Sequence, residues 1–283
     1  MLAHAGPGSW VVLDWTFEPL LVAALLVAAV GWLLAVARIG AAHAHAPVPP
    51  WRSVAFLGGL LTLFVALASP IDTFADDLFS VHMLQHVLIS FVAAPLLVLS
   101  APGTLLLRVA SPSVRHALLL PILHSRVVRA LTFPVFTWLL FAVVMWVAHF
   151  SPLFELALES DTVHQLEHLA FLASGFLYWL PAIGSDPLPW RLGGSGRLLY
   201  LFLGMPQSFV LGLVIVSQTT VMYHHYVAAG ALADQRLAGT VMWIGADVIS
   251  FVLIGVAGWQ WLRTETKRAR RQHAGPLAGT RPE

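Results

Sequence analysis

Two stretches of the sequence, SVHMLQHVLISF and DTVHQLEHLAFL, each contain a pair of histidines four residues apart. The pairs are His82 with His86 and His164 with His168. Residues at positions i and i+4 of an α-helix lie on one face, about 6 Å apart along the axis. With this spacing one helix can offer two imidazoles to one metal ion, as in zinc-binding helices. We therefore predict that two helices bring four imidazoles to one metal site.

Weaker ligand candidates accompany these pairs. They are Glu167, His149, His224, His225, Met83 and Met222. Glu167 could bind the metal or accept a hydrogen bond from an imidazole N–H, whereas Gln85, at the matching position of the first pair, could fill only the weaker, neutral version of the second role. Thioether and imidazole ligands together suit copper(I), although each methionine taken singly is more typical of packing. The alternative is a polar network that joins helix ends without a metal.

The composition indicates a membrane protein. The chain has 283 residues, of which 58% are hydrophobic and only 10% are charged. Soluble domains carry about 25% charged residues. The absence of cysteine excludes disulfides, thiolate metal ligands and thiol catalysis.

Apolar segments long enough to cross a bilayer, which takes about 20 residues, recur along the chain. The seven segments are roughly 17–39, 52–69, 79–100, 132–150, 163–181, 198–223 and 238–262. They predict an all-α membrane protein with a bundle of seven transmembrane helices. The longest loop, about 101–131, has room for a short surface helix.

The basic residues predict the orientation of the bundle, because Lys and Arg collect in cytoplasmic loops. With these spans, 14 of the 15 Lys and Arg residues fall on one side, and only Arg236 falls on the other. We therefore expect the N-terminus outside and the C-terminus inside. Residues 1–16 then form an extracytoplasmic segment, 17–262 the transmembrane domain, and 263–283 a basic, disordered cytoplasmic tail. Both histidine pairs lie at the outer face in this arrangement, and His224 and His225 end the sixth helix there.

Three stretches resemble one known family. HMLQHVLISFVAAPLLVLSAP, HQLEHLAFLASGFLYWLPAIG and ADQRLAGTVMWI are similar to stretches of the multi-spanning CtaG-type cytochrome c oxidase assembly factors. The resemblance covers about residues 17–262 and implies a role in maturing a haem–copper oxidase, with copper delivered to or inserted into a copper centre. The combination of imidazole and thioether candidates favours Cu(I) as the form of this copper. It places the two histidine pairs at the paired-histidine positions of the family, and Asp234 and Gln235 at its D-Q pair, to which no role is assigned.

The resemblance also implies partners and a location. The expected partners are oxidase subunits or other copper chaperones, together with membrane lipid but no nucleic acid, and the expected location is the bacterial plasma membrane. Zinc is a possible surrogate for copper at the site. The sequence leaves the oligomeric state open.

Two other functions fit parts of the pattern. The H-x-x-E-H stretch that ends at His168 matches an inverted zinc-protease motif, and an intramembrane zinc hydrolase or di-iron enzyme would use Glu167 as its base. A haem-b electron-transfer protein would use the histidines as axial ligands. We expect no enzymatic activity, and a metal-dependent membrane enzyme is the alternative. Such an enzyme needs a carboxylate base beside an open metal position, for which Glu167 is the one strong candidate.

Overall fold

The computed structural model describes residues 15, 18–42 and 45–274 of the chain. In this part, every regular element is a helix. The long helices are α1 (Pro19–Ala42), α2 (Pro50–Ala68), α10 (Pro134–Phe150), α12 (Asp161–Ile183), α13 (Gly194–Ser217) and α14 (Ala231–Ala274). A further long run is built from α4 (Phe79–Val87), η1 (Leu88–Ala93), α5 (Ala94–Ser100) and α6 (Pro102–Val109). Short helices complete the chain: α3 (Pro70–Ala75), α7 (Pro112–Val114), η2 (Arg115–Leu119), α8 (Leu120–Leu123), α9 (Arg126–Leu131), α11 (Leu153–Glu159) and η3 (His224–Tyr226).

The structure has six to seven helical segments that could span a membrane, and the upper number equals the predicted seven. Six helical segments of the described chain are long and apolar enough to cross a membrane. A seventh is added if α10 and α11, which meet at an angle of 66°, count as one span. The predicted all-helical membrane bundle is therefore confirmed, and its orientation in the membrane stays a prediction.

Prolines and one glycine set several helix boundaries. Pro50, Pro70 and Pro134 each occupy the first turn of a helix, where a missing N–H costs no hydrogen bond. Gly184 ends α12 with φ of 63°, a left-handed conformation that glycine adopts without strain.

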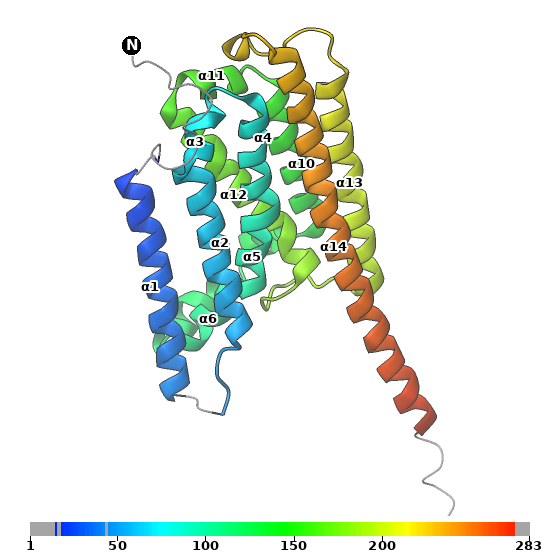
Figure 1. Ribbon diagram of the computed structural model, residues 1–283. Coiled ribbons are helices and arrows are strands. Elements are labelled where there is room, and N and C mark those ends of the chain that lie inside the picture. The colour runs from blue at the N-terminus through cyan, green and yellow to red at the C-terminus, as the bar shows by residue number, and fades with distance from the viewer. Residues whose placement is uncertain (1–14, 16–17, 43–44, 275–283) are drawn as a thin grey trace, which may run out of the picture.

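The run from α4 to α5 lies in the middle of the bundle, in contact with α2, α12 and α14 (Figure 1). Helix α1 lies at the edge against α2 and α6, and α13 pairs with α14 along their lengths. This last pair crosses closely at two glycines, because a Cβ at Gly212 would lie 2.5 Å from the carbonyl oxygen of Gly239. Small residues allow such close backbone approach between membrane helices.

The π-helix η1 begins two residues after His86 and changes the phase of the central run. A π turn widens the helix by one residue and frees carbonyl groups from the regular ladder. The indole Nε1–H of Trp179 donates to the Ser90 carbonyl across 2.8 Å. Helix α12 is thereby tied to the central run just below the histidines.

The sixth span ends earlier than predicted. Helix α13 stops at Ser217, and residues 218–223 take a non-helical course. The amide of Gln235 stabilises this course, because its Oε1 accepts from the backbone N–H of Met222 at 2.8 Å and its Nε2 donates to the Thr220 carbonyl at 3.2 Å. An apolar run alone could not reveal this side chain from another helix.

The last helix is longer than the predicted span of 238–262. Helix α14 begins at Ala231 and continues to Ala274. The first part of the predicted disordered tail is therefore helical, which fits its many Arg, Lys, Glu and Ala residues, all good helix formers. The predicted segment 1–16, apart from Trp15, and residues 275–283 lie outside the described residues.

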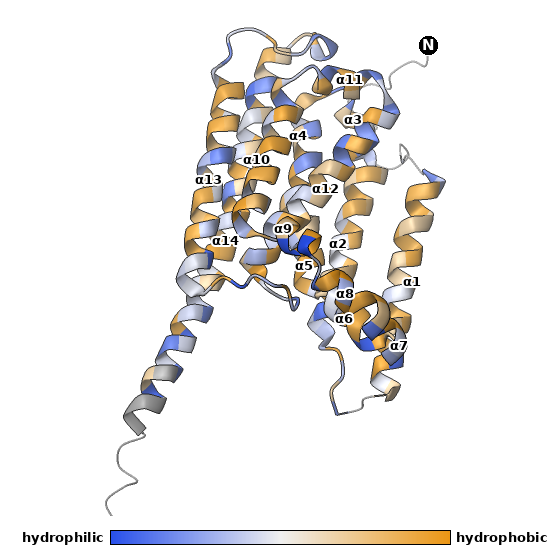
Figure 2. Cartoon of the chain, turned by 180° about the vertical axis from the view of Figure 1, so that it is seen from behind, coloured by the Kyte–Doolittle hydropathy of each residue, from blue (hydrophilic) through white to orange (hydrophobic). Residues whose placement is uncertain are grey.

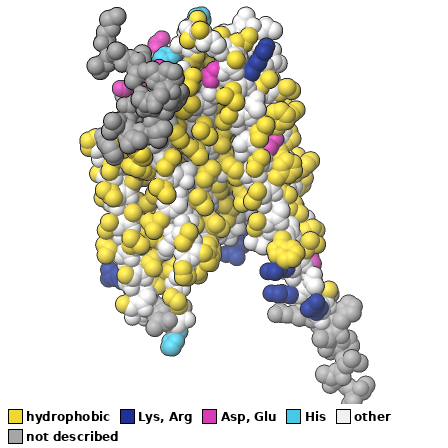
Figure 3. Space-filling view, in the orientation of Figure 1, with side chains coloured by type: hydrophobic (Ala, Val, Ile, Leu, Met, Phe, Trp, Pro, Cys, Tyr) yellow, Lys and Arg dark blue, Asp and Glu magenta, His cyan; other side chains and the backbone are white. Residues whose placement is uncertain are grey.

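The two ends of the bundle differ in charge. Hydrophobic residues predominate along the long helices, and hydrophilic residues are more frequent toward both ends (Figure 2). Figure 3 shows most of the visible Lys and Arg side chains at the end where α14 leaves the bundle, and most acidic side chains at the other. We call the first the arginine end. The other, where α4 and α12 begin and η3 lies, is the histidine end.

A crevice opens at the arginine end. It has a volume of about 600 Å³ and is lined by parts of α2, α5, α12, α13 and α14. Figure 3 shows the molecule hollowed between the lower half of α14 and the rest of the bundle. The lining is mostly apolar, with Arg52 and Arg197 as its charged members.

Candidate metal centre

Four histidines from two helices meet at the histidine end. His82 and His86 lie in the first two turns of α4, and His164 and His168 lie in those of α12. Within the helices the ring centroids are 4.4 Å and 4.2 Å apart. Between the helices, His82 and His164 are 5.1 Å apart, and His86 and His168 are 5.6 Å apart. We call these four residues the histidine cluster.

The histidine cluster is enclosed by protein. His82 and His86 are fully buried, His168 is 7% exposed, and His164 is half-buried. Phe154 packs against His82, and Phe171 packs against His86. The cluster is therefore shielded on its inner side and more open at His164.

Many polar atoms of the histidine cluster and of the neighbouring Glu167 have no hydrogen-bond partner among the described residues. They are Nε2 of His82, both ring nitrogens of His86, Nε2 of His164, Nε2 of His168 and Oε2 of Glu167. Buried polar groups nearly always have partners, and each one left without a partner costs about 1–3 kcal/mol. A cation bound among these atoms would remove that cost, so the residues fit a metal ion.

Three ligand atoms are arranged for one ion. Ligand atoms of His82, His164 and Glu167 all lie within 4.8 Å of one another. Ligands bound at about 2.0–2.2 Å are at most about 4.4 Å apart, so small shifts would close the three groups around an ion. The carboxylate is also 3.9 Å from Nε2 of His86, too far for a hydrogen bond and near enough for an ion pair with a charged imidazole.

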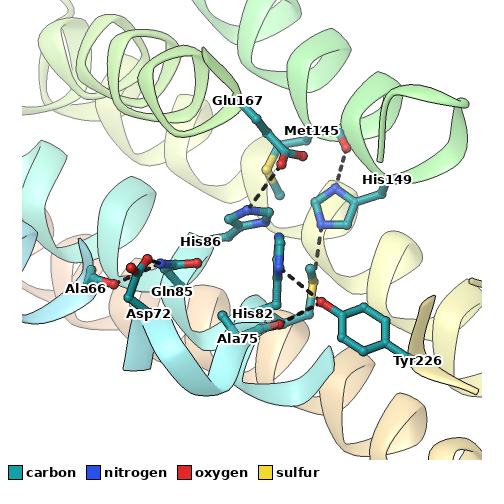
Figure 4. A network of polar contacts seen from close by, with 11 residues as sticks. Ala66, Asp72, Ala75, His82, Gln85, His86, Met145, His149, Glu167 and Tyr226 are labelled. Carbon is teal, nitrogen blue, oxygen red and sulfur yellow. Dashed lines mark hydrogen bonds and ion pairs between the residues drawn. The ribbon is translucent and has the colours of Figure 1, made fainter. Parts of the chain in front are cut away.

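Tyr226 fixes which nitrogen of His82 faces the cluster (Figure 4). Burial raises the pKa of Tyr226 well above its usual range, so its hydroxyl keeps its proton. That proton is donated to the Ala75 carbonyl at 2.8 Å, so the hydroxyl oxygen accepts from Nδ1–H of His82 at 3.2 Å. Nε2 of His82 is then unprotonated, and it is the nitrogen that has no partner. A metal ligand needs this tautomer.

His149 and Met83 also lie beside the histidine cluster. His149 comes from the last turn of α10 and is fully buried, and its ring centroid is 5.7 Å from that of His86. Its Nε2 lies 3.3 Å from the sulfur of Met83 on α4. The hydroxyl of Tyr223 donates to the backbone carbonyl of His149.

The structure does not bring the other candidates into the cluster. The side chain of His224 is exposed and its Nδ1 lies 3.2 Å from Oε1 of Glu155. His225 is exposed and bonds the Asp76 carbonyl at 2.9 Å. Met222 is half-buried against the hydrophobic core. The expectation that both histidines end the sixth helix was wrong, because they lie in η3, beyond the end of α13.

The stretch YHHY therefore contributes its tyrosines rather than its histidines. Tyr223 and Tyr226 are 6% and 7% exposed and contact His149 and His82 respectively. The sequence analysis missed them as site residues. The sequence did contain a signal for them, since two tyrosines three residues apart flank polar residues at the end of a predicted span.

Three polar residues that the sequence analysis singled out hold neighbouring segments in place. Gln85 points away from the imidazoles, and its Nε2 donates to the Ala66 carbonyl at 2.9 Å and to Oδ1 of Asp72 at 2.8 Å (Figure 4). Gln85 therefore does not take the supporting role toward an imidazole that its position in the sequence allowed. Asp234 accepts from the backbone N–H of Ser80 at 3.2 Å and from its hydroxyl. The D-Q pair of the third motif thus fixes the start of α4 through Asp234 and the segment before η3 through Gln235.

One known family matches most of the chain. The family described as cytochrome c oxidase caa3 assembly factor (Caa3_CtaG) matches residues 19–264. The chain belongs to this family. The match to the caa3 assembly factor family includes both histidine pairs, His149 and the YHHY stretch, so every residue of the candidate centre lies within the shared region.

Mycobacterial proteins are among its relatives. The chain is 30% identical over 271 residues to the uncharacterized protein Mb0105 of Mycobacterium bovis, and 29% identical over 272 residues to the uncharacterized protein ML1998 of Mycobacterium leprae. The alignments cover 91% of this chain but only 41% of each relative. The chain therefore spans less than half the length of these curated relatives. No solved structure matches the chain.

Proposed function

We propose that this caa3 assembly factor family member binds copper at the histidine cluster and delivers it to, or inserts it into, a copper centre of a haem–copper oxidase. The observation that carries the proposal is the set of buried imidazole nitrogens that converge without hydrogen-bond partners. Membership of the family supports a role in oxidase assembly, and the converging ligand atoms support copper binding as that role. The partners would be oxidase subunits or other copper chaperones.

The position of the cluster suits a metal that is cargo. The cluster lies near the start of two helices, where His164 is half-buried and the Glu167 side chain is 9% exposed. Ligands at such a margin can exchange with those of a donor or an acceptor protein. Copper would move by stepwise replacement of one ligand by another, with no change in its oxidation state.

The geometry disfavours a haem held between the paired helices. The rings of His82 and His164 are stacked, with 5.1 Å between centroids and 26° between planes. Two axial histidines of one haem instead point at the iron from opposite faces of the porphyrin. The close contact supports a small ion as the ligand of these two rings.

The test replaces all four histidines of the cluster by alanine. We expect the variant to insert but to leave the oxidase without copper, measured as oxidase activity and copper content of membranes relative to the amount of variant protein. The matched control is His224→Ala, His225→Ala, which removes two exposed imidazoles at the same end of the bundle. Full oxidase activity in the quadruple variant would show that the cluster is structural.

The direction of copper delivery depends on the orientation. The distribution of basic residues favours a cytoplasmic arginine end, and in that orientation the histidine cluster would receive copper from outside. Reporter fusions should locate the C-terminus inside. A C-terminus outside would turn the histidine cluster toward the cytoplasm and reverse the proposed route.

A further inference from the structure

The contact between Nε2 of His149 and the sulfur of Met83 is not a hydrogen bond, because neither atom has a hydrogen to donate. Nδ1 of His149 lies 2.7 Å from the Met145 carbonyl, and its Nε2 lies 3.3 Å from the sulfur of Met83. A neutral imidazole has one N–H, and a carbonyl oxygen only accepts. The short contact with Met145 therefore places the hydrogen on Nδ1. Nε2 then turns a lone pair toward the lone pairs of the thioether.

Burial makes this arrangement costly. His149 and Met83 are both 0% exposed, so water cannot separate the two acceptors. The opposite tautomer only moves the conflict to the Met145 carbonyl. Tyr223 holds the backbone of His149 through its carbonyl, and Met83 is fixed next to His82 on α4. The pair is therefore held in place by the fold rather than by mutual attraction.

We propose that Nε2 of His149 and the sulfur of Met83 bind a copper(I) ion, at a position separate from the one formed by His82, His164 and Glu167. Imidazole and thioether form a soft ligand set suited to Cu(I), whereas a set with a carboxylate suits harder ions as well. Two ligands bound at about 2.0 and 2.3 Å with a tetrahedral angle lie about 3.5 Å apart, close to the observed contact.

The two positions have a connecting residue. The ring of His86 is 4.4 Å from that of His82 and 5.7 Å from that of His149. Both of its nitrogens are buried and have no hydrogen-bond partner among the described residues. His86 can therefore accept the ion from one position and pass it to the other by ligand exchange, with copper remaining Cu(I). This inference rests on the proposed function for the identity of the cargo.

The test is X-ray absorption of the full-length protein loaded with Cu(I) and purified on a tag without histidines. We expect a sulfur ligand at about 2.3 Å in the wild type. Met83→Leu removes the thioether, so it should abolish the sulfur signal and release about one equivalent of copper. The substitution conserves volume, so the fold should be retained. Met145→Leu is the matched control, a second buried methionine whose backbone carbonyl is unchanged. It should retain the sulfur signal.

The outcomes separate this inference from the proposed function. Copper bound by nitrogen and oxygen alone would overturn the second position while leaving the histidine cluster intact. Sulfur ligation lost in Met145→Leu but kept in Met83→Leu would also overturn it. A wild-type protein that binds no copper would overturn both proposals.

Discussion

The histidine cluster and the crevice at the arginine end both lie between the long helices, but the cluster is polar and the crevice is mostly apolar. The crevice, about 600 Å³ in volume, has no His, Asp, Glu or Met among its lining residues. The cluster gathers unpartnered nitrogens and a carboxylate oxygen within a few ångströms. The volume of a cavity therefore does not indicate where a metal would bind in this protein. A single ion needs converging ligand atoms and very little space, whereas an apolar crevice is an ordinary consequence of helices that diverge in a membrane.

The largest effect should follow from single changes in the cluster. His82→Ala or His164→Ala removes a direct ligand, and loss of even a supporting contact costs about 10–100-fold in metal affinity. The fold should lose only about 0.5–3 kcal/mol, the usual range for one substitution. Oxidase activity should therefore fall while the protein stays in the membrane, and added copper should partly restore it by mass action. Metal titration of each purified variant measures the affinity.

Glu167→Gln should have a smaller effect on copper than either histidine change. The amide keeps an oxygen near the nitrogens of His82 and His164, and the histidines carry most of the affinity for copper. We expect a loss of less than about tenfold in copper affinity, measured by competition with a chelator. An enzyme that uses Glu167 as its base would behave differently. In that case the variant would keep its metal and lose all activity.

Tyr226→Phe tests the support of the cluster without changing a ligand. The substitution removes the acceptor for Nδ1–H of His82 and the donor to the Ala75 carbonyl. We expect about a tenfold loss of metal affinity and about 1–2 kcal/mol of stability. Tyr200→Phe is the matched control, since it removes a similar buried bond, to the Tyr178 carbonyl, from another part of the bundle. Equal metal affinity in the two variants would contradict the role of Tyr226.

A change in the crevice should have the smallest effect. Val252 lines the crevice and is 61% exposed, so Val252→Phe meets few neighbours. We expect a stability change within about 0.5 kcal/mol and unchanged copper affinity. Thermal unfolding and metal titration in detergent provide the measurements. A clear loss of copper in this variant would show that the two regions are coupled.

The sequence predicted the parts of this structure that depend on local pattern. Apolar runs located the spans, because the bilayer requires continuous apolar helices. The run ending near Tyr223 misled at its end, since the amide of Gln235 holds the backbone of Thr220 and Met222 out of the helix. Apolar composition carries no information about a side chain from another helix.

The same limit explains the errors around the site. The histidines of YHHY suggested ligands, yet they point to Glu155 and Asp76 while the tyrosines turn inward. Gln85 suggested support for an imidazole, yet it braces α2 and α3. In each case the sequence showed that the side chain would need a polar partner, but only the tertiary structure determined which partner it has.

The sequence by itself determined that His82 with His86, and His164 with His168, each share a helix face, because helical periodicity follows from backbone hydrogen bonding alone. It also determined that charge separates between the two ends of the bundle. Only the tertiary structure decided that the two pairs face each other, that Tyr226 selects the tautomer of His82, and that Met83 meets His149. The lateral placement of helices comes from side-chain packing across the whole bundle, which no local segment specifies.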